Sequence, residues 1–306
     1  MTTLVFGHKS PDTDATMSAI VWAWYLTNHR NTPAAPRLLG EPNTEAAFVL
    51  GHWGFAKPEI ITEVAQDQKV VIVDTNNPAE LPNTIFGADI RAIIDHHMLV
   101  GGLRTKAPID VIIRPLACTA TVMHDIMGAD VAALPRDIKG AMLSCIISDT
   151  LAFRSPTTTP HDRAVAEKLA ADIGVAIPEL ADAMFAAKSD ISAFTDAELL
   201  RMDSKEYNVA GKELRVSVLE TTAPKVVLDR KASLMASMVG VAEEDEADQV
   251  LLFVVDIIRE EAPLLVPNDL VRQMAEASFG VKVTGDTVVL PGVMSRKKQI
   301  IPALKM

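Results

Sequence analysis

Three short apolar runs, each followed by polar side chains that can bind metal ions, constrain the fold of this chain more than any other feature. The runs are Leu4–Gly7, Val70–Val73 and Ala92–Ile94. The polar residues that follow them are His8, Asp74 and the tripeptide Asp95-His96-His97. In open α/β sheets, ligands bind at the carboxyl ends of the strands. The pattern therefore predicts that residues far apart in the sequence meet in one crevice.

The amino-acid sequence around these runs is typical of alternating strands and helices. A fourth strand is expected at Val111–Ile113, and helical patterns cover Asp14–His29, Thr121–Met127, Asp137–Ile147 and His161–Ile173. Such alternation predicts a doubly wound, mostly parallel sheet. We assign residues 1–188 to this α/β domain.

A polar stretch at 189–195 reads as a hinge linker to a smaller α+β domain at 196–306, with the active site in the cleft between the domains. A helix opening at Pro178 leads into the linker, because proline suits the first helical position. The second domain is expected to contain a hairpin at Ala210–Gly211, a long helix over Lys225–Val241, strands at Val250–Ile258 and Leu264–Val266, and a final helix and strand.

The first polar motif reads Gly-His-Lys-Ser-Pro-Asp-Thr-Asp. It brings His8, Asp12 and Asp14 within seven residues at a strand-to-helix turn. Imidazole nitrogens and carboxylate oxygens bind Mn, Fe, Co or Zn. The alternative interpretation is a polar loop in which Asp14 caps the following helix.

Three further motifs add ligand candidates. An aspartate directly after a buried strand, such as Asp74, can bridge two ions, or it can simply end the strand in a turn. Adjacent side chains at an extended strand end point in opposite directions. One histidine of the His96-His97 pair is therefore expected to bind a metal and the other a ligand, with Asp95 orienting a histidine from behind; the alternative is a pair of surface histidines. Asp149 ends an apolar helix, where it is a ligand candidate or a helix-terminal turn residue.

If they clustered, the four candidate aspartates Asp12, Asp14, Asp74 and Asp149 would repel one another and raise one another's pKa values. Two divalent ions would remove this cost, and a pair of ions can hold both the attacking and the leaving oxygen in phosphoryl transfer. All seven histidines lie at or before His161, so a histidine-containing metal site must belong to the first domain.

Composition narrows the class of protein further. The net charge of −11 argues against broad binding to nucleic acid. The beginning of the chain does not read as a targeting segment, and its apolar runs are too short to span a bilayer, so we expect a cytoplasmic protein without membrane contact. Cys118 and Cys145 are expected to be reduced core thiols. Lys205 and the segment Ser295-Arg296-Lys297-Lys298-Gln299 are candidate phosphate-binding cations, or a solvated basic tail.

The motifs GHKSPDTDAT, VDTNN, DHH, SDT, DSKEY and SRKKQ together resemble the family II inorganic pyrophosphatases of the DHH phosphoesterase superfamily, with a DHHA2-type second domain. The resemblance covers nearly the whole chain and shows no departure at a ligand position, although Ser204 stands where many members carry a larger residue. It implies hydrolysis of inorganic pyrophosphate to two orthophosphates by an enzyme that usually forms homodimers through its first domain.

The resemblance also implies residue roles. One metal would be held by His8, Asp12, Asp74 and Asp149. The other would be held by Asp14, Asp74, His96 and Asp149, with Asp95 behind the ligands. The substrate phosphates would be bound by His97, Lys205, Arg296 and Lys297. The tight sites would hold two Mn²⁺ or Co²⁺ ions, and additional Mg²⁺ or Mn²⁺ would arrive with the substrate.

On this basis a hydroxide that bridges the two metals is expected to attack one phosphorus in line, and closure of the second domain over the first completes the site. A short-chain polyphosphatase and an oligonucleotide phosphodiesterase remain as alternatives. The second would share the metal site, but the aromatic content of 5% disfavours a platform for stacking bases.

Overall fold

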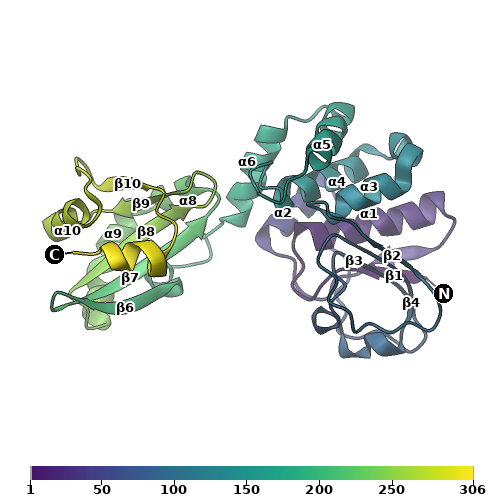
Figure 1. Ribbon diagram of the computed structural model, residues 1–306, viewed down its shortest axis with the longest axis horizontal. Coiled ribbons are helices and arrows are strands. Elements are labelled where there is room, and N and C mark those ends of the chain that lie inside the picture. The colour runs from purple at the N-terminus through teal and green to yellow at the C-terminus, as the bar shows by residue number, and fades with distance from the viewer. Residues whose placement is uncertain (1, 306) are drawn as a thin grey trace. The chain divides into compact units, whose positions relative to one another are not determined.

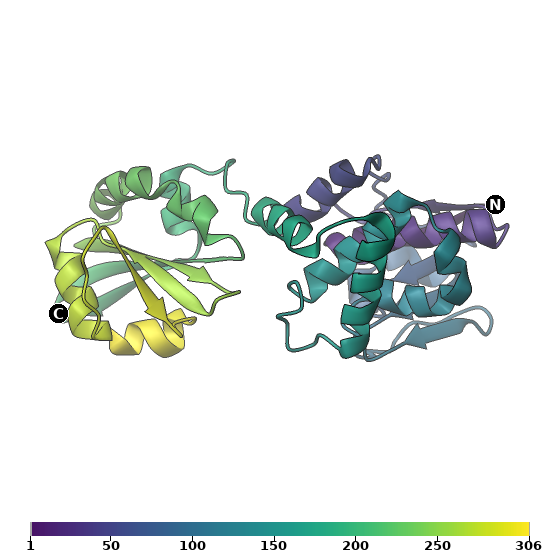
Figure 2. The same cartoon turned by 90° about the horizontal axis from the view of Figure 1, so that it is seen from above.

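The computed structural model describes residues 2–305, which form two compact units, Met1–Lys188 and Ser189–Met306 (Figures 1 and 2). Each unit has its own five-stranded sheet. None of the helices in the described part of the chain is both long and apolar enough to cross a membrane.

The sheet of the first unit is parallel throughout, with the strand order β2-β1-β3-β4-β5. Its strands are β1 (Thr3–Phe6), β2 (Ala34–Pro36), β3 (Lys69–Val73), β4 (Asp89–Asp95) and β5 (Asp110–Ile113). All four expected strands are present, which confirms the parallel α/β interpretation. The short strand β2 was not expected, because three residues that include a proline give no recognisable strand pattern.

Helices cover this sheet and bring their ends to its carboxyl edge. They are α1 (Thr13–His29), α2 (Thr44–Trp53), α3 (Thr119–Met127), α4 (Arg136–Asp149), α5 (Pro160–Ile173) and α6 (Ile177–Lys188). Helix α1 packs on β1 and β2, α4 packs on α1, and α3 packs on β4 (Figure 1). A separate core cluster unites strand residues Phe6 and Ile72 with Leu81 and with Ile85 of the 3-10 helix Asn83–Gly87.

Helix α2 was also not expected, although its two ends carry ordinary signals. The side chain of Asn43 accepts a hydrogen bond from the backbone nitrogen of Ala46 (2.8 Å), and Gly54 ends the helix with a φ of 76°. These are a typical N-cap and a typical left-handed C-cap. The helix matters for the site, because it carries the fully buried Glu45.

The second unit has a mixed sheet with the order β10-β9-β8-β7-β6, in which only the β7–β8 pair is parallel. Its strands are β6 (Ser204–Val209), β7 (Lys212–Thr221), β8 (Gln249–Asp256), β9 (Glu261–Leu265) and β10 (Thr287–Pro291). Every residue of β8 is buried, because apolar clusters pack on both faces of this central strand. The expected hairpin is present, with φ of 51° at Ala210 and 84° at Gly211, as a primed two-residue turn requires.

The helices of the second unit correct one expectation. They are α7 (Asp196–Met202), α8 (Pro224–Leu228), α9 (Lys231–Glu244), α10 (Asp269–Phe279) and α11 (Ile301–Ala303). The single helix expected over Lys225–Val241 is wrong, since the chain breaks between α8 and α9. Arg230 lies at the break and donates hydrogen bonds to the carbonyl oxygens of Ile191 and Phe194 (3.0 Å each). Its guanidinium also pairs with Asp196 (2.5 Å), so contacts with distant residues fix the break.

Candidate metal centre

The loop between β1 and α1 presents the first ligand candidates. Asp12 is the N-cap of α1, and its Oδ1 accepts a hydrogen bond from the nitrogen of Ala15 (3.0 Å). The alternative interpretation, in which Asp14 caps this helix, is therefore wrong. The other carboxylate oxygen of Asp12 lies 3.7 Å from Nε2 of His8. Capping thus fixes the Asp12 side chain while leaving one oxygen directed at the histidine.

Asp74 lies at the centre of the site and faces two histidines with different oxygens. It follows β3 directly and adopts a left-handed backbone with φ of 57°, which is uncommon outside glycine. Its Oδ2 lies 3.5 Å from Nε2 of His8, and its Oδ1 lies 3.4 Å from Nε2 of His96. One carboxylate therefore connects the loop after β1 with the loop after β4.

Asp95, the last residue of β4, organises both histidines behind it. Its Oδ1 accepts hydrogen bonds from the backbone nitrogens of His96 (2.8 Å) and His97 (3.1 Å) and from Nδ1 of His97 (2.9 Å). Its Oδ2 accepts from the side-chain amide of Asn76 (2.6 Å). The two rings lie with centroids 4.2 Å apart, so the expectation that they point in opposite directions is wrong. The strand ends at Asp95, and the turn around its carboxylate replaces the alternation of a strand.

The ring of His96 is held by its second nitrogen. Nδ1 donates to the carbonyl oxygen of Leu116 (3.2 Å), which leaves Nε2 facing carboxylates. Nε2 lies 3.8 Å from Asp149 and 4.0 Å from Asp14. A backbone acceptor on one imidazole nitrogen is the usual way in which proteins orient a histidine that binds metal through the other.

Asp14 and Asp149 complete the cluster in contrasting ways. Both oxygens of the buried Asp14 accept hydrogen bonds, from the hydroxyl of Ser18 (2.8 Å) and the backbone nitrogen of Thr119 (2.7 Å). In contrast, Oδ2 of Asp149 is buried without a hydrogen-bond partner among the described residues. Asp149 is also the last residue of α4, where the helix dipole disfavours a negative charge. His96 Nε2 is 3.8 Å from this oxygen, which is beyond hydrogen-bond distance, and a buried carboxylate oxygen without a hydrogen bond is costly.

The pKa values of the cluster describe a site with too much negative charge. Burial acts to lower the pKa of His8, but the carboxylates of Asp12 and Asp74 outweigh it and raise this pKa to about 10. His96 behaves in the same way, and its pKa rises to about 9. Burial and the charge of Asp74 raise the pKa of Asp14 to about 6, and burial with the charge of Asp14 raises the pKa of Asp149 well above its usual range.

Asp74 shows the opposite behaviour. Burial acts to raise its pKa, but contacts with His8 and His96 outweigh burial and lower it. The cluster as a whole thus binds protons more tightly at His8, His96, Asp14 and Asp149 than these groups would in water. Divalent cations would supply the same positive charge, and proteins release such protons when they bind metal.

The donor atoms fit divalent metal ions. They form three overlapping groups, in each of which the donor atoms lie within 4.8 Å of one another. The groups are His8-Asp12-Asp74, Asp14-His96-Asp149 and Asp74-His96-His97. The six residues expected as ligands are therefore brought together. Mixed nitrogen and oxygen donors suit Mn, Fe, Co and Zn, and the unpaired oxygen of Asp149 is a place where a cation is needed.

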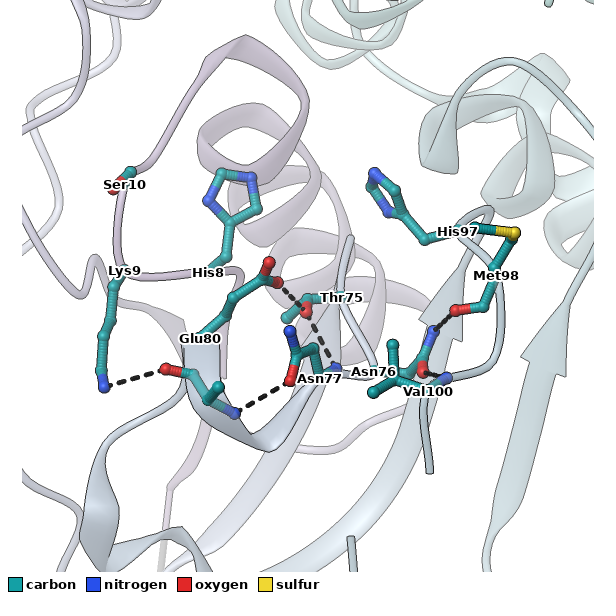
Figure 3. Close-up of a pocket in the computed structure, with 11 residues that line it drawn as sticks. His8, Lys9, Ser10, Thr75, Asn76, Asn77, Glu80, His97, Met98 and Val100 are labelled. Carbon is teal, nitrogen blue, oxygen red and sulfur yellow. Dashed lines mark hydrogen bonds between the residues drawn. The ribbon is translucent and has the colours of Figure 1, made fainter. Parts of the chain in front are cut away.

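A pocket of about 630 Å³ opens beside this cluster (Figure 3). His8 and His97 lie on either side of it, and Figure 3 shows their rings projecting from separate loops. The loop after β3 forms the floor, where the hydroxyl of Thr75 donates to Glu80 (2.5 Å) and Asn76 accepts from the nitrogen of Val100 (2.7 Å). The pocket is lined by polar residues such as Lys9 and Ser10 and also by the apolar side chains of Met98 and Val100.

A buried network supports the ligand loops from below. Oε2 of Glu45 accepts hydrogen bonds from the hydroxyls of Thr13 (3.1 Å) and Ser148 (2.7 Å) and from Nζ of Lys188 (3.3 Å). Thr13 lies between Asp12 and Asp14, and Ser148 precedes Asp149. Sequence analysis assigned no role to Glu45, Thr119 or Asn76, because ordinary polar residues carry no signal until the fold brings them to the ligands.

The candidate phosphate-binding cations lie in the second unit. Arg296 begins a π-helical turn, Arg296–Ile300, so the basic segment is ordered and is not a loose tail. Its guanidinium donates to the carbonyl oxygen and to Oδ1 of Asp203 (2.7 Å each), two residues before Lys205. Lys205 is an exposed residue of β6. The side chain of Lys297 lies outside the described part of the structure.

Comparison with known proteins identifies two domain families. Residues 2–148 match the DHH family N-terminal domain, and residues 182–306 match the DHHA2 domain. A Deinococcus radiodurans protein named "Probable manganese-dependent inorganic pyrophosphatase" is 40% identical over 98% of this chain and 97% of its own length. The manganese-dependent inorganic pyrophosphatase of Methanocaldococcus jannaschii is 35% identical, again over 98% and 97%.

A solved structure described as "Crystal structure of Methanococcus jannaschii putative family II inorganic pyrophosphatase" has the same architecture. It superposes with a TM-score of 0.61 at 35% sequence identity and covers 98% of this chain and 97% of its own chain. The likeness therefore extends over both units.

Proposed function

Because the chain belongs to the family of manganese-dependent, or family II, inorganic pyrophosphatases, we propose that its cluster of carboxylates and histidines holds two metal ions for the hydrolysis of pyrophosphate. The enzyme converts inorganic pyrophosphate to two orthophosphates. One observation carries the metal assignment: the two oxygens of Asp74 face separate histidines, as a carboxylate that bridges two ions must.

The proposed ligand sets follow the two sides of Asp74. One ion is held by His8, Asp12, Asp74 and Asp149. The other is held by Asp14, Asp74, His96 and Asp149. The donor groups His8-Asp12-Asp74 and Asp14-His96-Asp149 support this division, whereas the second contact of Asp149 follows from the family resemblance.

When bound, two divalent ions lower the pKa of a coordinated water and neutralise charge on the phosphate oxygens. The residues of the chain bind the substrate and offset its charge. His97, held by Asp95, donates a hydrogen bond to a substrate oxygen, and its own hydrogen bond to that aspartate raises the pKa of the imidazole. Lys205, Arg296 and Lys297 hold the second phosphate and offset charge on the leaving oxygen. The linker 189–195 would act as the hinge through which the second unit closes over the substrate.

Finer features of the family are proposed in the same way. The tight sites take Mn²⁺ or Co²⁺, and Mg²⁺ or further Mn²⁺ arrives with the substrate. The enzyme works in the cytoplasm as a homodimer that is formed through the first unit. The dimer is supported by strand β5, which lies at the edge of the first sheet and exposes Val111.

The test is orthophosphate release by protein that has been stripped with a chelator and reloaded with Mn²⁺. Pyrophosphate, tripolyphosphate and a short oligonucleotide are supplied in parallel with Mg²⁺, and bound manganese is counted per chain. We expect two ions per chain and rapid release from pyrophosphate alone. Preference for tripolyphosphate or the oligonucleotide would keep the metal centre but overturn the proposed substrate.

A further inference from the structure

Thr119, the first residue of α3, contacts two of the proposed metal ligands at once. Its hydroxyl Oγ1 donates to Oδ1 of Asp74 (3.0 Å), and its backbone nitrogen donates to Oδ2 of Asp14 (2.7 Å). The residue is fully buried and lies outside the pocket lining, so it does not contact a substrate bound there. These two aspartates come from different elements, 45 and 105 residues away in the sequence.

The hydroxyl of Thr119 contacts Asp74, the carboxylate that faces both proposed metal-binding histidines. Oδ1 of Asp74 accepts from Thr119 and also lies 3.4 Å from His96, whereas Oδ2 faces His8. The carboxylate torsion of aspartate is broad, so a partial rotation of the Asp74 carboxylate would move both oxygens away from their partners. The hydrogen bond from Thr119 holds Oδ1 on the side of His96 and thereby keeps Oδ2 on the side of His8.

The backbone nitrogen of Thr119 is free to serve Asp14 because of its place in the helix. The first N–H groups of a helix have no partner within the helix and carry partial positive charge. Cys118, the N-cap of α3, forms no side-chain cap hydrogen bond. Because the hydroxyl of Ser18 donates to Oδ1, both carboxylate oxygens of Asp14 are held by hydrogen bonds.

We propose that Thr119 is a positioning residue for the metal centre, which sets the Asp74 and Asp14 carboxylates in the geometry that binds both ions. The inference rests on the proposed two-metal function. Thr119 acts through the aspartates alone, so its loss weakens ion binding and leaves the chemistry of the loaded enzyme intact.

The experiment compares four variants of the full chain. Thr119→Val keeps the shape and the backbone N–H but removes the hydroxyl, and Thr119→Ser restores the hydroxyl without the methyl group. Thr119→Ala is a second variant without a hydroxyl, in case the valine variant does not fold. Thr121→Val is the matched control, because the hydroxyl of Thr121 is buried on the same helix with no hydrogen-bond partner in the described part of the chain.

Manganese affinity is measured without substrate, from the electron paramagnetic resonance signal of free Mn²⁺. Loss of a group that orients a metal ligand typically costs 10–100-fold in affinity. We expect Thr119→Val and Thr119→Ala to bind Mn²⁺ at least about tenfold more weakly, within this range, while Thr119→Ser and Thr121→Val stay close to the parent. At saturating Mn²⁺, turnover of Thr119→Val should return to nearly that of the parent protein.

The possible results separate the inference from the function. If the parent binds Mn²⁺ and Thr119→Val binds it equally well, the inference fails and the proposed function stands. A serine variant as weak as the valine variant would assign the effect to packing of the methyl group and would also overturn the inference. If the parent binds no Mn²⁺, the proposed function and the inference fall together.

Discussion

Replacing Asp149 by asparagine should stabilise the metal-free protein, although it removes a proposed ligand of both ions. The buried Oδ2 of Asp149 lacks a hydrogen-bond partner among the described residues, and the neighbouring carboxylates of Asp14 and Asp74 repel its charge. In Asp149→Asn the amide has the same shape, carries no charge and can donate hydrogen bonds to those carboxylates.

The size of the stability change follows from the missing hydrogen bond to Oδ2 of Asp149. A buried polar group without a partner costs about 1–3 kcal/mol, so we expect a gain of about 2 kcal/mol in the free energy of unfolding. In a unit of 188 residues, this raises the melting temperature by about 4–8 °C. Each ion supplied at 100 times its dissociation constant adds about 2.7 kcal/mol, so two ions add about 5 kcal/mol to the parent. Manganese should therefore reverse the order of stability.

The sign of the pH dependence gives a second check. The pKa of Asp149 is raised in the folded state, so the folded protein holds this proton more tightly than the unfolded chain. The stability of the metal-free parent then falls as pH rises above the ordinary carboxyl pKa of about 4. The advantage of Asp149→Asn should be small near pH 5 and larger at pH 8.

Thermal unfolding followed by circular dichroism, with chelator and with Mn²⁺, measures all of these quantities. Asp137→Asn is the matched control: the same substitution at the opposite end of α4, where Asp137 accepts a hydrogen bond from the nitrogen of Ile138 (3.0 Å). We expect it to destabilise slightly in both conditions, because an acid favours the N-terminal end of a helix. A metal-free Asp149→Asn that melts below the parent at pH 8 would refute the reasoning.

Two other substitutions test the packing and the second unit. Gly140→Ala should lower the free energy of unfolding, because a Cβ there would lie 2.5 Å from the ring of Trp53. The cost of overpacking, up to about 3 kcal/mol, exceeds the gain of about 1 kcal/mol from the better helix propensity of alanine. Urea unfolding followed by tryptophan fluorescence measures the net loss of stability. An increase in stability would contradict the close packing. Asp203→Asn should raise the KM for pyrophosphate about 2–5-fold, the equivalent of a weak ion pair, and leave manganese affinity unchanged, because it loosens the Arg296 guanidinium. An unchanged KM would mean that Arg296 needs no such support.

Sequence reasoning succeeded where a local pattern determines the structure. Continuous apolar runs predicted β1, β3, β4 and β5, and the convergence of His8, Asp74 and His96 followed from the common edge of a parallel sheet. It failed where distant contacts decide. The break between α8 and α9 depends on contacts of Arg230 with residues more than thirty positions away, and the directions of His96 and His97 depend on a turn around one carboxylate.

Thr119 shows a further limit. In the sequence it is an ordinary threonine near the start of a predicted helix. Only the fold brings its hydroxyl to Asp74 and its backbone nitrogen to Asp14. In the same way, the structure alone reveals that Asp12 both caps α1 and faces His8. Ligand candidates can be found from their chemistry, whereas the groups that hold them are found from their neighbours.

The order of the residues along the chain separates two stages in the life of the enzyme. Every proposed metal ligand has been synthesised once the ribosome reaches Asp149, about half-way along the chain, and domains at the N-terminus generally fold first. Lys205 and Arg296, which are proposed to bind the phosphates, follow Asp149 by 56 and 147 residues and are made later. On these proposals a growing chain completes its metal ligands before it completes its phosphate-binding cations, so ion binding can precede the hydrolysis of pyrophosphate.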